Sequence, residues 1–434
     1  MKSNRFWAAA SKVLAAATLT LIVALVLAPG AWAAGKYKIL YQFTGGADGD
    51  LPNGRLVFDA AGSLYGTTAF GGAYGEGNVF KLTRKSDGRW RESVLYSFIG
   101  GSDGQEPLDG LIFDAGGSLY GTTAWGGDYG DGVVFELTPN SDGSWTESVL
   151  HSFTGSDGSD PIEGVTFDAA GNLYGIAWGG GTQGRGVVYE LVPNSDGTWT
   201  ESVLYSFTGG QDGGSPDRGR LLFDAAGNLY GVTGGGGTGS CNGQWGEGCG
   251  VIFELTPNSD GGWTESVLHS FTGGKDGAVP EGLVFDQAGA LYGVTALGGG
   301  GPCSYKIKGC GTVFKLTPKS KGGWTEQVLH RFRNSDGANP WASPVFDSAG
   351  NLYDTTLTGG SGGCSDWMNG DCGTVFKLMP NSHGGWTERV LHRFGKTAAN
   401  HPYAGVVLDA KGAIYGEGEG EYTGSAGAVF EIVP

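Results

Sequence analysis

Short runs of β-branched and aromatic residues recur along the chain, each bounded by residues that form turns. In one representative stretch the runs are GLIFD (110–114), SLYGTTA (118–124), VVFELTP (133–139) and WTESVLHSF (145–153). Such runs are typical of β-strands. The segments between them, of the types DAAGN and PNSDG, predict tight turns, because Asp and Asn bond to the nearby backbone and Gly adopts positive φ. Each stretch therefore predicts four antiparallel strands.

This four-strand unit occurs seven times. Its first turn begins with an aspartate in every copy, at Asp59, Asp114, Asp168, Asp224, Asp286, Asp347 and Asp409, in steps of 54 to 62 residues. Seven tandem units of four antiparallel strands predict an all-β protein, a seven-bladed β-propeller. Since these aspartates all lie in predicted turns, we interpret them as structural rather than catalytic.

The two ends of the repeat region predict how the ring closes. Residues 36–43 (KYKILYQF) resemble the fourth run of a unit, and the chain stops at AVFEIVP (428–434), a third run. We expect the N-terminal strand to complete the last blade. A linear solenoid would instead carry atypical capping units, which this sequence lacks.

Residues 1–33 have the pattern of a secretory signal peptide. A basic start precedes an apolar run, and Ala31 and Ala33 form an A-x-A cleavage site. A retained membrane anchor is the alternative, but the run is short for a span and contains Thr18 and Thr20. We expect cleavage after Ala33, no later membrane span, and one propeller over 34–434 located outside the cell or in the periplasm.

Composition and charge restrict the class of partner. The 434 residues include 86 Gly, but 13 Trp, 17 Tyr and 21 Phe are too many for a disordered chain. Loss of Lys2, Arg5 and Lys12 with the leader would take the net charge from −17 to −20. A chain this acidic is a poor binder of nucleic acid or anionic lipid, although it could attract cations or basic partners. We expect a monomer.

The repeated pattern LYGTT…GG…G.G.VF.L, followed by W.E.VLYSF and a GG.DG..P loop, resembles the GloVer tandem-repeat family of exported bacterial proteins. The resemblance covers essentially everything after the leader. It implies a secreted or surface-displayed repeat protein, often with a C-terminal sorting or adhesion module, and supplies no catalytic residues. This chain ends at Pro434 directly after a blade strand, so we expect free secretion.

The long loops are expected to share one face of the propeller, because the fourth-to-first and second-to-third connections of each blade lie on the same side. Three longer inserts, in blades four to six, hold all six cysteines. We predict the local disulfides Cys241–Cys249, Cys303–Cys310 and Cys364–Cys372. A zinc site is the alternative, but the spacing is wide and no histidine lies beside the cysteines.

Aromatic residues in these loops are candidates for ligand contact. The candidates are Trp245, Tyr305 and Trp367 in the long inserts, and Phe70, Tyr74, Trp125, Tyr129 and Trp178 in the shorter loops. Rigid rings could stack on carbohydrate or on a protein partner. The alternative is that each ring packs beneath its own loop.

Charged residues at the start of the innermost strands differ between copies. We expect Arg55, Asp109, Glu163, Arg220 and Glu281 near one mouth of the central channel, against small or apolar residues in blades six and seven. Three carboxylates could hold a divalent cation such as calcium, whereas the two arginines favour salt bridges. His151, His269, His330 and His392 occupy one repeat position and are expected to be structural.

Two functions are compatible with this pattern. The first is a non-enzymatic binding or structural propeller that uses the long-loop face. The second is a lactonase-like hydrolase or a lyase with a divalent metal at the channel mouth, which would rest on analogy of fold alone. The first is favoured, because the three acids are spread over blades two, three and five rather than converging from every side of the channel.

Overall fold

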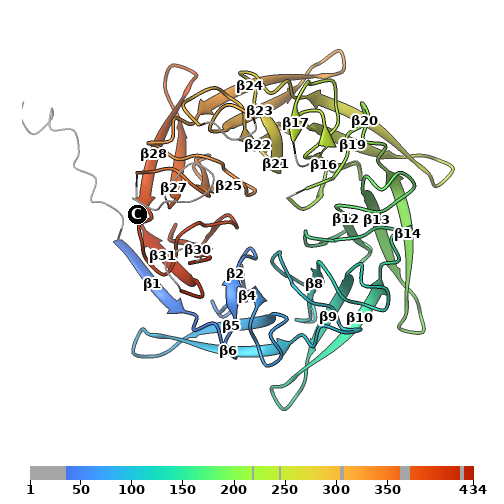
Figure 1. The fold of residues 1–434 in the computed structure, drawn as a ribbon, viewed down its shortest axis with the longest axis vertical. Helices are drawn as coiled ribbons and strands as arrows, with labels where there is room; N and C mark the ends of the chain where they lie inside the picture. The colour runs from blue at the N-terminus through green and yellow to red at the C-terminus, as the bar shows by residue number, and fades with distance from the viewer. Residues whose placement is uncertain (1–35, 218, 244–245, 304–306, 362–371, 421–424) are drawn as a thin grey trace, which may run out of the picture.

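The computed structural model describes residues 36–217, 219–243, 246–303, 307–361, 372–420 and 425–434. Seven sheets surround a central axis, and the described residues contain no helix (Figure 1). No segment among them is therefore a helix that could cross a membrane. The predicted seven-bladed, all-β propeller is confirmed.

Each blade has four antiparallel strands. The strands of each blade are given below in order from the channel outward, and their numbers follow the chain. Blade one contains β3 (Val57–Phe58), β4 (Leu64–Phe70), β5 (Asn78–Arg84) and β6 (Trp90–Ser97), and β2 (Asp50–Pro52) also pairs with β4. Blade two contains β7 (Ile112–Phe113), β8 (Leu119–Thr123), β9 (Val133–Pro139) and β10 (Trp145–Ser152). Blade three contains β11 (Thr166–Phe167), β12 (Leu173–Ala177), β13 (Val187–Pro193) and β14 (Trp199–Ser206).

The remaining blades follow the same order. Blade four contains β15 (Leu222–Phe223), β16 (Leu229–Thr233), β19 (Val251–Pro257) and β20 (Trp263–Ser270), with a small hairpin of β17 (Asn242–Gly243) and β18 (Gly246–Glu247) in its insert. Blade five contains β21 (Ala278–Phe285), β22 (Leu291–Leu297), β23 (Thr312–Pro318) and β24 (Trp324–Arg331). Blade six contains β25 (Val345–Phe346), β26 (Leu352–Thr356), β27 (Thr374–Pro380) and β28 (Trp386–Arg393).

Blade seven joins the two ends of the chain. It contains β29 (Val407–Leu408), β30 (Ile414–Gly418), β31 (Ala428–Val433) and β1 (Lys36–Gln42). The register of β1 with β31 runs from Lys36 opposite Val433 to Gln42 opposite Ala428, with a bulge near Ile39. The fourth strand of blade two carries the equivalent bulge near Val149. The N-terminal strand thus copies a fourth strand in detail, and the predicted closure of the ring is confirmed.

Six of the seven innermost strands span two residues and are shorter than the sequence predicts, whereas β21 of blade five spans eight residues. In blade two the predicted run 110–114 reduces to β7, Ile112–Phe113. The chains crowd together before that strand begins: a Cβ atom on Gly110 would lie 1.9 Å from the carbonyl oxygen of Arg55. Only glycine allows this approach, and ladder pairing starts further from the crowded point.

Aromatic side chains pack between neighbouring blades and form much of the core. Phe98, which follows β6, meets Phe135 of β9 edge to face at 5.1 Å between ring centroids. Trp145 of β10 packs against Tyr65 of blade one at 6.5 Å. Similar pairs recur around the ring, so the strand tryptophans are structural.

The repeated aspartate phrase forms the predicted turn. Asp59 Oδ1 accepts hydrogen bonds from the backbone N–H groups of Ala61 and Ser63, and its Oδ2 accepts one from the Tyr65 hydroxyl. Equivalent bonds form at Asp168, Asp224, Asp286 and Asp347. The repeated aspartate motif therefore has a structural role. The long loops lie on the face of the propeller opposite these turns.

Candidate binding face

The long-loop face is built on one repeated backbone contact between blades. In each blade a non-glycine residue with φ between 49° and 57° donates its N–H to the carbonyl of a residue in the preceding blade. These residues are Leu51, Glu106, Asp160, Ser215, Val279, Asn339 and His401. Left-handed backbone at non-glycine residues is costly and persists where surrounding structure enforces it. The blade contacts therefore hold the loops of this face in place.

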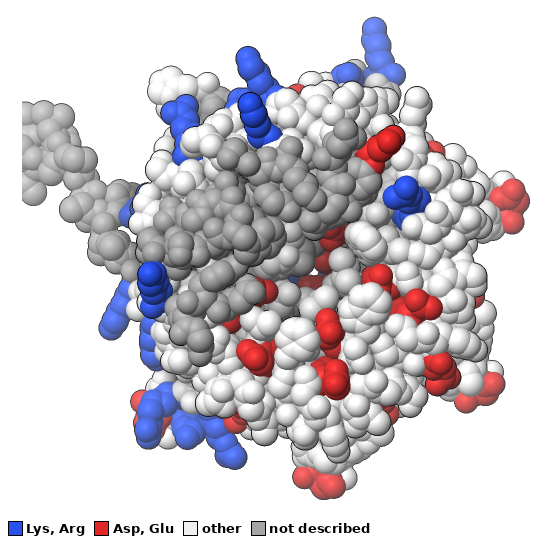
Figure 2. All heavy atoms as spheres, viewed as in Figure 1, with Lys and Arg blue, Asp and Glu red and all other residues white. Residues whose placement is uncertain are grey.

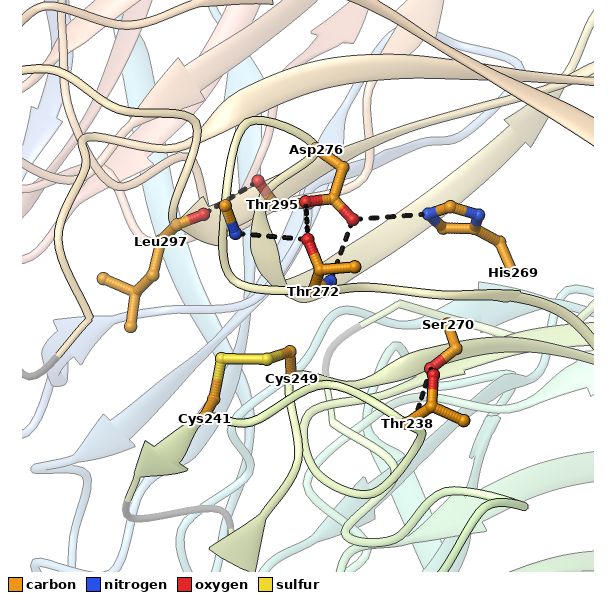
Figure 3. The surroundings of a disulfide bond; sticks show 10 residues. Thr238, Cys241, Cys249, His269, Ser270, Thr272, Asp276, Thr295 and Leu297 are labelled. Atoms are coloured by element: carbon orange, nitrogen blue, oxygen red, sulfur yellow. Dashed lines mark hydrogen bonds and ion pairs between the residues drawn. A yellow bond between two sulfur atoms is a disulfide. The ribbon is translucent and has the colours of Figure 1, made fainter.

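Two of the predicted disulfides brace this contact. Cys241 is bonded to Cys249, as Figure 3 shows, and Cys303 is bonded to Cys310. The carbonyl of Cys249 accepts the N–H of Val279 in blade five, so the disulfide fixes the residue that contacts the next blade. Each of these two disulfides joins cysteines of a single loop, as predicted. The third predicted pair, Cys364–Cys372, includes Cys364, which lies outside the described residues.

Four of the five predicted channel residues line one pocket at the channel mouth. Arg55, Asp109, Glu163 and Arg220 share its walls with Trp341 and Tyr403, whose rings meet edge to face at 5.1 Å. We call this the channel-mouth pocket. Its volume of about 30 Å³ is enough for one or two water molecules. It could therefore admit a single functional group of a partner, but not a whole sugar ring.

Hydrogen bonds and one ion pair hold the charged side chains of this pocket in place. Asp109 Oδ2 accepts from Arg220 Nε at 3.1 Å and from the N–H of Gly164 at 2.8 Å. Glu163 Oε2 accepts the N–H of Gly219 at 2.8 Å. Burial alone would raise the pKa of Asp109, but Arg220 and the backbone donors outweigh it and hold this pKa below its usual value. Asp109 is thus a carboxylate already matched by a cation.

The expectation of small or apolar residues in blades six and seven concerned the innermost strands, and the second strands of these blades bring two acids to the same region. Asp354 of β26 is fully buried, and burial raises its pKa to about 7 despite a bond from the Thr355 N–H and the charge of Arg55. Glu417 of β30 is 1% exposed, and burial followed by the charge of Asp109 raises its pKa well above the usual value. Both side chains come from second strands rather than from the innermost strands.

A sequence signal for these two acids exists. Asp354 stands where the other six copies have glycine in LYG or IYG, and Glu417 stands where other copies have Thr, Ile or Val. Comparing second strands as closely as first strands would have found them. Glu281, by contrast, is fully buried in β21 and is not among the residues that line the channel-mouth pocket.

A second cavity lies further along the channel, toward the face of the tight turns. Arg55 and Arg220 line it together with apolar residues of the innermost strands, among them Val57, Ile112 and Val407. Its volume is about 440 Å³. Burial and then the charge of Arg220 lower the pKa of Arg55. The two guanidinium groups thus line both the channel-mouth pocket and a larger cavity whose other lining residues are apolar.

Exposed aromatic side chains gather in the loops of blades one and two. Among the described residues, the aromatic side chains with the largest exposure are Tyr129 (67%), Tyr74 (63%), Trp125 (43%) and Phe70 (37%). Tyr74, Trp125 and Tyr129 belong to second-to-third-strand connections and Phe70 ends β4, whereas Trp178 in blade three is half-buried. The predicted contacts Trp245, Tyr305 and Trp367 lie outside the described residues, so their role stays a prediction.

Carboxyl groups crowd beside these rings. The N–H of Glu106 donates to the carbonyl of Glu76, and the N–H of Asp160 donates to that of Asp131. Burial and then the charge of Asp131 raise the pKa of Asp160 to about 6, and burial with Glu76 raises that of Glu106. Figure 2 shows acidic residues around the channel opening on this half of the face. We call Tyr74, Trp125, Tyr129 and these four acids the acid–aromatic patch.

Several solved structures resemble this chain at low sequence identity. A gluconolactonase from Xanthomonas campestris is 16% identical, with 75% of this chain and 89% of that chain covered and a TM-score of 0.41. The PQQ-bound aldose sugar dehydrogenase of Streptomyces coelicolor is 12% identical (92% and 98% covered, TM-score 0.44), and the PQQ domain of Coprinopsis cinerea pyranose dehydrogenase is 10% identical (93% and 96%, 0.45). These likenesses say nothing of activity. No curated protein sequence matches the chain.

The repeat itself identifies the family. The sequence profile of the Gloeobacter/Verrucomicrobia repeat matches residues 29–245, 109–301 and 239–434, three overlapping spans that together cover all seven blades. This agrees with the resemblance carried by the LYGTT and W.E.VLYSF motifs. The chain belongs to the Gloeobacter/Verrucomicrobia repeat family.

Proposed function

We propose that this protein is an exported, non-enzymatic binding protein that contacts a basic partner through its long-loop face. The observation that carries the proposal is the acid–aromatic patch, where exposed Tyr74, Trp125 and Tyr129 lie beside crowded carboxyl groups. Rings and carboxylates together suit lysine and arginine side chains, through cation–π contact and ion pairing.

Crowding of the acids explains why a basic partner is favoured over a neutral one. The raised pKa of Asp160 reflects burial and the nearby charge of Asp131, which disfavour a second negative charge. A cationic group placed between the two carboxylates would relieve this repulsion, whereas a neutral sugar would not. The formal net charge of −17 would also speed the approach of a basic partner.

Export is supported by the local disulfides, which persist in oxidising compartments. The A-x-A pattern at Ala31 and Ala33 agrees with export, although residues 1–35 lie outside the described part of the structure. A partner of this protein would then be met outside the cytoplasm, as an extracellular protein or a basic surface.

The competing function, an enzyme with a divalent metal at the channel mouth, is less well supported. Oδ2 of Asp109 already accepts bonds from Arg220 and Gly164, and Arg55 lies close by. Two guanidinium groups at this mouth oppose the binding of a divalent cation. The pocket better suits recognition of one polar group at the edge of a larger contact.

The experiment is a binding screen of the immobilised protein against a lysine- and arginine-rich peptide library and an array of neutral glycans. We expect basic peptides to bind and the affinity to fall as salt rises. Trp125→Ala and Tyr129→Ala should each weaken binding by at least about 1 kcal/mol if they are anchors. Trp245→Ala and Trp367→Ala test whether the patch extends over blades four to six.

Two controls separate binding from folding. Val203→Ala changes an exposed residue on the outer strand of blade three and should leave binding intact. Trp145→Ala removes an inter-blade packing contact and should instead damage folding. Salt-independent glycan binding, or loss of binding only by variants in the tight turns, would show that the ligand class or the face is wrong.

A further inference from the structure

A three-residue contact recurs at six of the seven blade interfaces, on the outer strands. It joins a Tyr or His near the end of a fourth strand, an Asp in the following loop, and a Glu on the fourth strand of the next blade. The sets are Tyr41–Asp48–Glu92, Tyr96–Asp103–Glu147, His151–Asp157–Glu201, Tyr205–Asp212–Glu265, His269–Asp276–Glu326 and His330–Asp336–Glu388. Where the first residue is Tyr, its hydroxyl donates to the Asp, at 2.9 Å for Tyr96.

Two of the six loops are one residue shorter than the others, and both belong to sets with histidine. TGSD (154–157) and RNSD (333–336) replace the five-residue type TGGAD (44–48). In the short loops the N–H of residue 154 or 333 bonds to Oδ1 of the Asp, at 2.8 and 2.7 Å. The other oxygen, Oδ2, then faces the histidine.

The long loop after His269 shows what the shortening changes. There the N–H of Thr272 bonds to Oδ2 of Asp276, and His269 Nε2 lies 3.8 Å from that oxygen (Figure 3). In the short loops the distance from Nε2 to Oδ2 is 3.0 Å for His151–Asp157 and 3.2 Å for His330–Asp336. In these two sets the shorter loop and the histidine together place an imidazole nitrogen against a carboxylate oxygen that the loop N–H does not use.

A glutamate from the next blade completes each cluster. Ligand atoms of His151, Asp157 and Glu201 all lie within 4.8 Å of one another, as do those of His330, Asp336 and Glu388. Oε1 of Glu201 and Oε1 of Glu388 are buried without a hydrogen-bond partner among the described residues, as is Oε1 of the equivalent glutamate in the other four sets. Each cluster thus brings two carboxyl groups and one imidazole together.

In each cluster two carboxyl groups lie within 4.8 Å of one another, and they repel each other when both are ionised. A divalent cation among the three ligand atoms would balance two carboxylates and remove their repulsion.

We propose that these two clusters are zinc-class metal sites, with Nε2 of the histidine, Oδ2 of the aspartate and Oε1 of the glutamate as ligands and water in the remaining position. One imidazole and two carboxylates suit Zn²⁺ better than Ca²⁺, which takes six to eight oxygen ligands. The loop N–H on Oδ1 orients the aspartate for this role. Since the glutamate comes from the next blade, each ion would join blades two and three, or five and six.

Titration of the metal-free protein with ZnCl₂ tests the proposal. The full chain, purified without a histidine tag and treated with a chelator, should bind two Zn²⁺ per chain by calorimetry. His151→Tyr with His330→Tyr should bind none. Tyrosine occupies this position in three other sets, where it bonds to the Asp, so this variant is expected to fold. Glu201→Gln alone should leave one ion.

The matched control is His269→Tyr, which changes the histidine whose ring stands away from its aspartate and should keep two ions. Substitution of Co²⁺ should give the absorption of a four-coordinate site in the parent and lose it in the double variant. No binding by the parent would overturn the proposal and leave His151 and His330 as hydrogen-bond partners only. Equal binding by parent and double variant would also overturn it, because the metal would then lie elsewhere.

Discussion

Arg220 in blade four donates from its guanidinium Nε to Oδ2 of Asp109 in blade two across 3.1 Å, although 111 residues separate them. The two blades are not neighbours in the ring. The pair therefore bridges the start of the innermost strands of blades two and four, past blade three. The side chains of Arg220 and Asp109 are only 18% and 15% exposed. Removal of either one would therefore leave the other as an unpaired, largely buried charge.

Arg220→Met should destabilise the propeller by about 3 kcal/mol at neutral pH, because it leaves Asp109 without its cation. The low pKa of Asp109 contributes stability above the pKa of an unfolded aspartate, near 3.9, and this is lost as pH falls through the folded pKa. The deficit of the variant should therefore shrink in acid. Thermal melts over a pH series measure this.

Arg89→Met is the control, because the side chain of Arg89 is 81% exposed in its pair with Asp87. It should change stability by less than about 0.5 kcal/mol. Equal melting of the Arg220 variant and the parent at pH 7 would show that the channel-mouth pair does not contribute to stability.

The fold could be predicted almost completely from the sequence, because the same pattern of strands and turns occurs seven times. The third strand VVFELTP was predicted at the bounds that β9 has, and the fourth run WTESVLHSF differs from β10 by one residue. The innermost strand was overestimated, because the close approach of Gly110 to Arg55 belongs to neighbouring blades. Sequence periodicity within one blade does not report such crowding.

The site was less predictable, because it depends on which blades meet at the axis. Arg55, Asp109, Glu163 and Arg220 were found as departures from the repeat in one strand. Asp354 and Glu417 reach the same region from another strand, and their departures were overlooked. The histidines were interpreted as structural because they share one position. The effect of a one-residue loop deletion on Asp157 appears only in three dimensions.

Replacing both Cys241 and Cys249 with Ser should lower stability without opening the ring. The disulfide closes a loop with a sequence separation of 8, so its contribution through the unfolded chain is about 2.5 kcal/mol at most. The bond from Val279 N–H to the Cys249 carbonyl uses the backbone and should persist. Melting temperature and mass mapping of unreduced peptides check this; a peptide linking two blades would contradict the loop-local pairing.

Deletion of Lys36–Gln42 should abolish soluble expression. Without β1, the β31 strand (Ala428–Val433) would expose an unpaired and partly apolar edge, which promotes aggregation. The variant also loses the stack of Tyr37 on His392, whose rings lie 3.9 Å apart. The double variant Lys36→Ala, Lys38→Ala keeps the strand backbone and should remain soluble. A truncated chain that melts cooperatively at the parent temperature would contradict closure by β1.

The glutamates at the blade interfaces should make the ring less stable as pH rises toward neutrality. Burial and then the charge of Asp212 raise the pKa of Glu265 to about 7, whereas glutamate in an unfolded chain titrates near 4.3. Between these values the folded chain holds the proton that the unfolded chain has lost, so stability falls with increasing pH. Glu92, Glu147 and Glu326 share this shift.

Glu265→Gln should therefore stabilise the protein by about 1 kcal/mol at pH 8 and should have no effect near pH 4. The value at pH 8 allows for the partial exposure of this side chain. Glutamine resembles the protonated acid, so it removes the cost of ionisation without removing the side chain from the interface. Ser266→Ala, at the exposed neighbouring position of β20, should follow the parent at every pH. Melting temperatures from pH 4 to pH 8 measure the difference in stability between Glu265→Gln and the parent. If this difference does not grow with pH, Glu265 ionises freely in the folded ring.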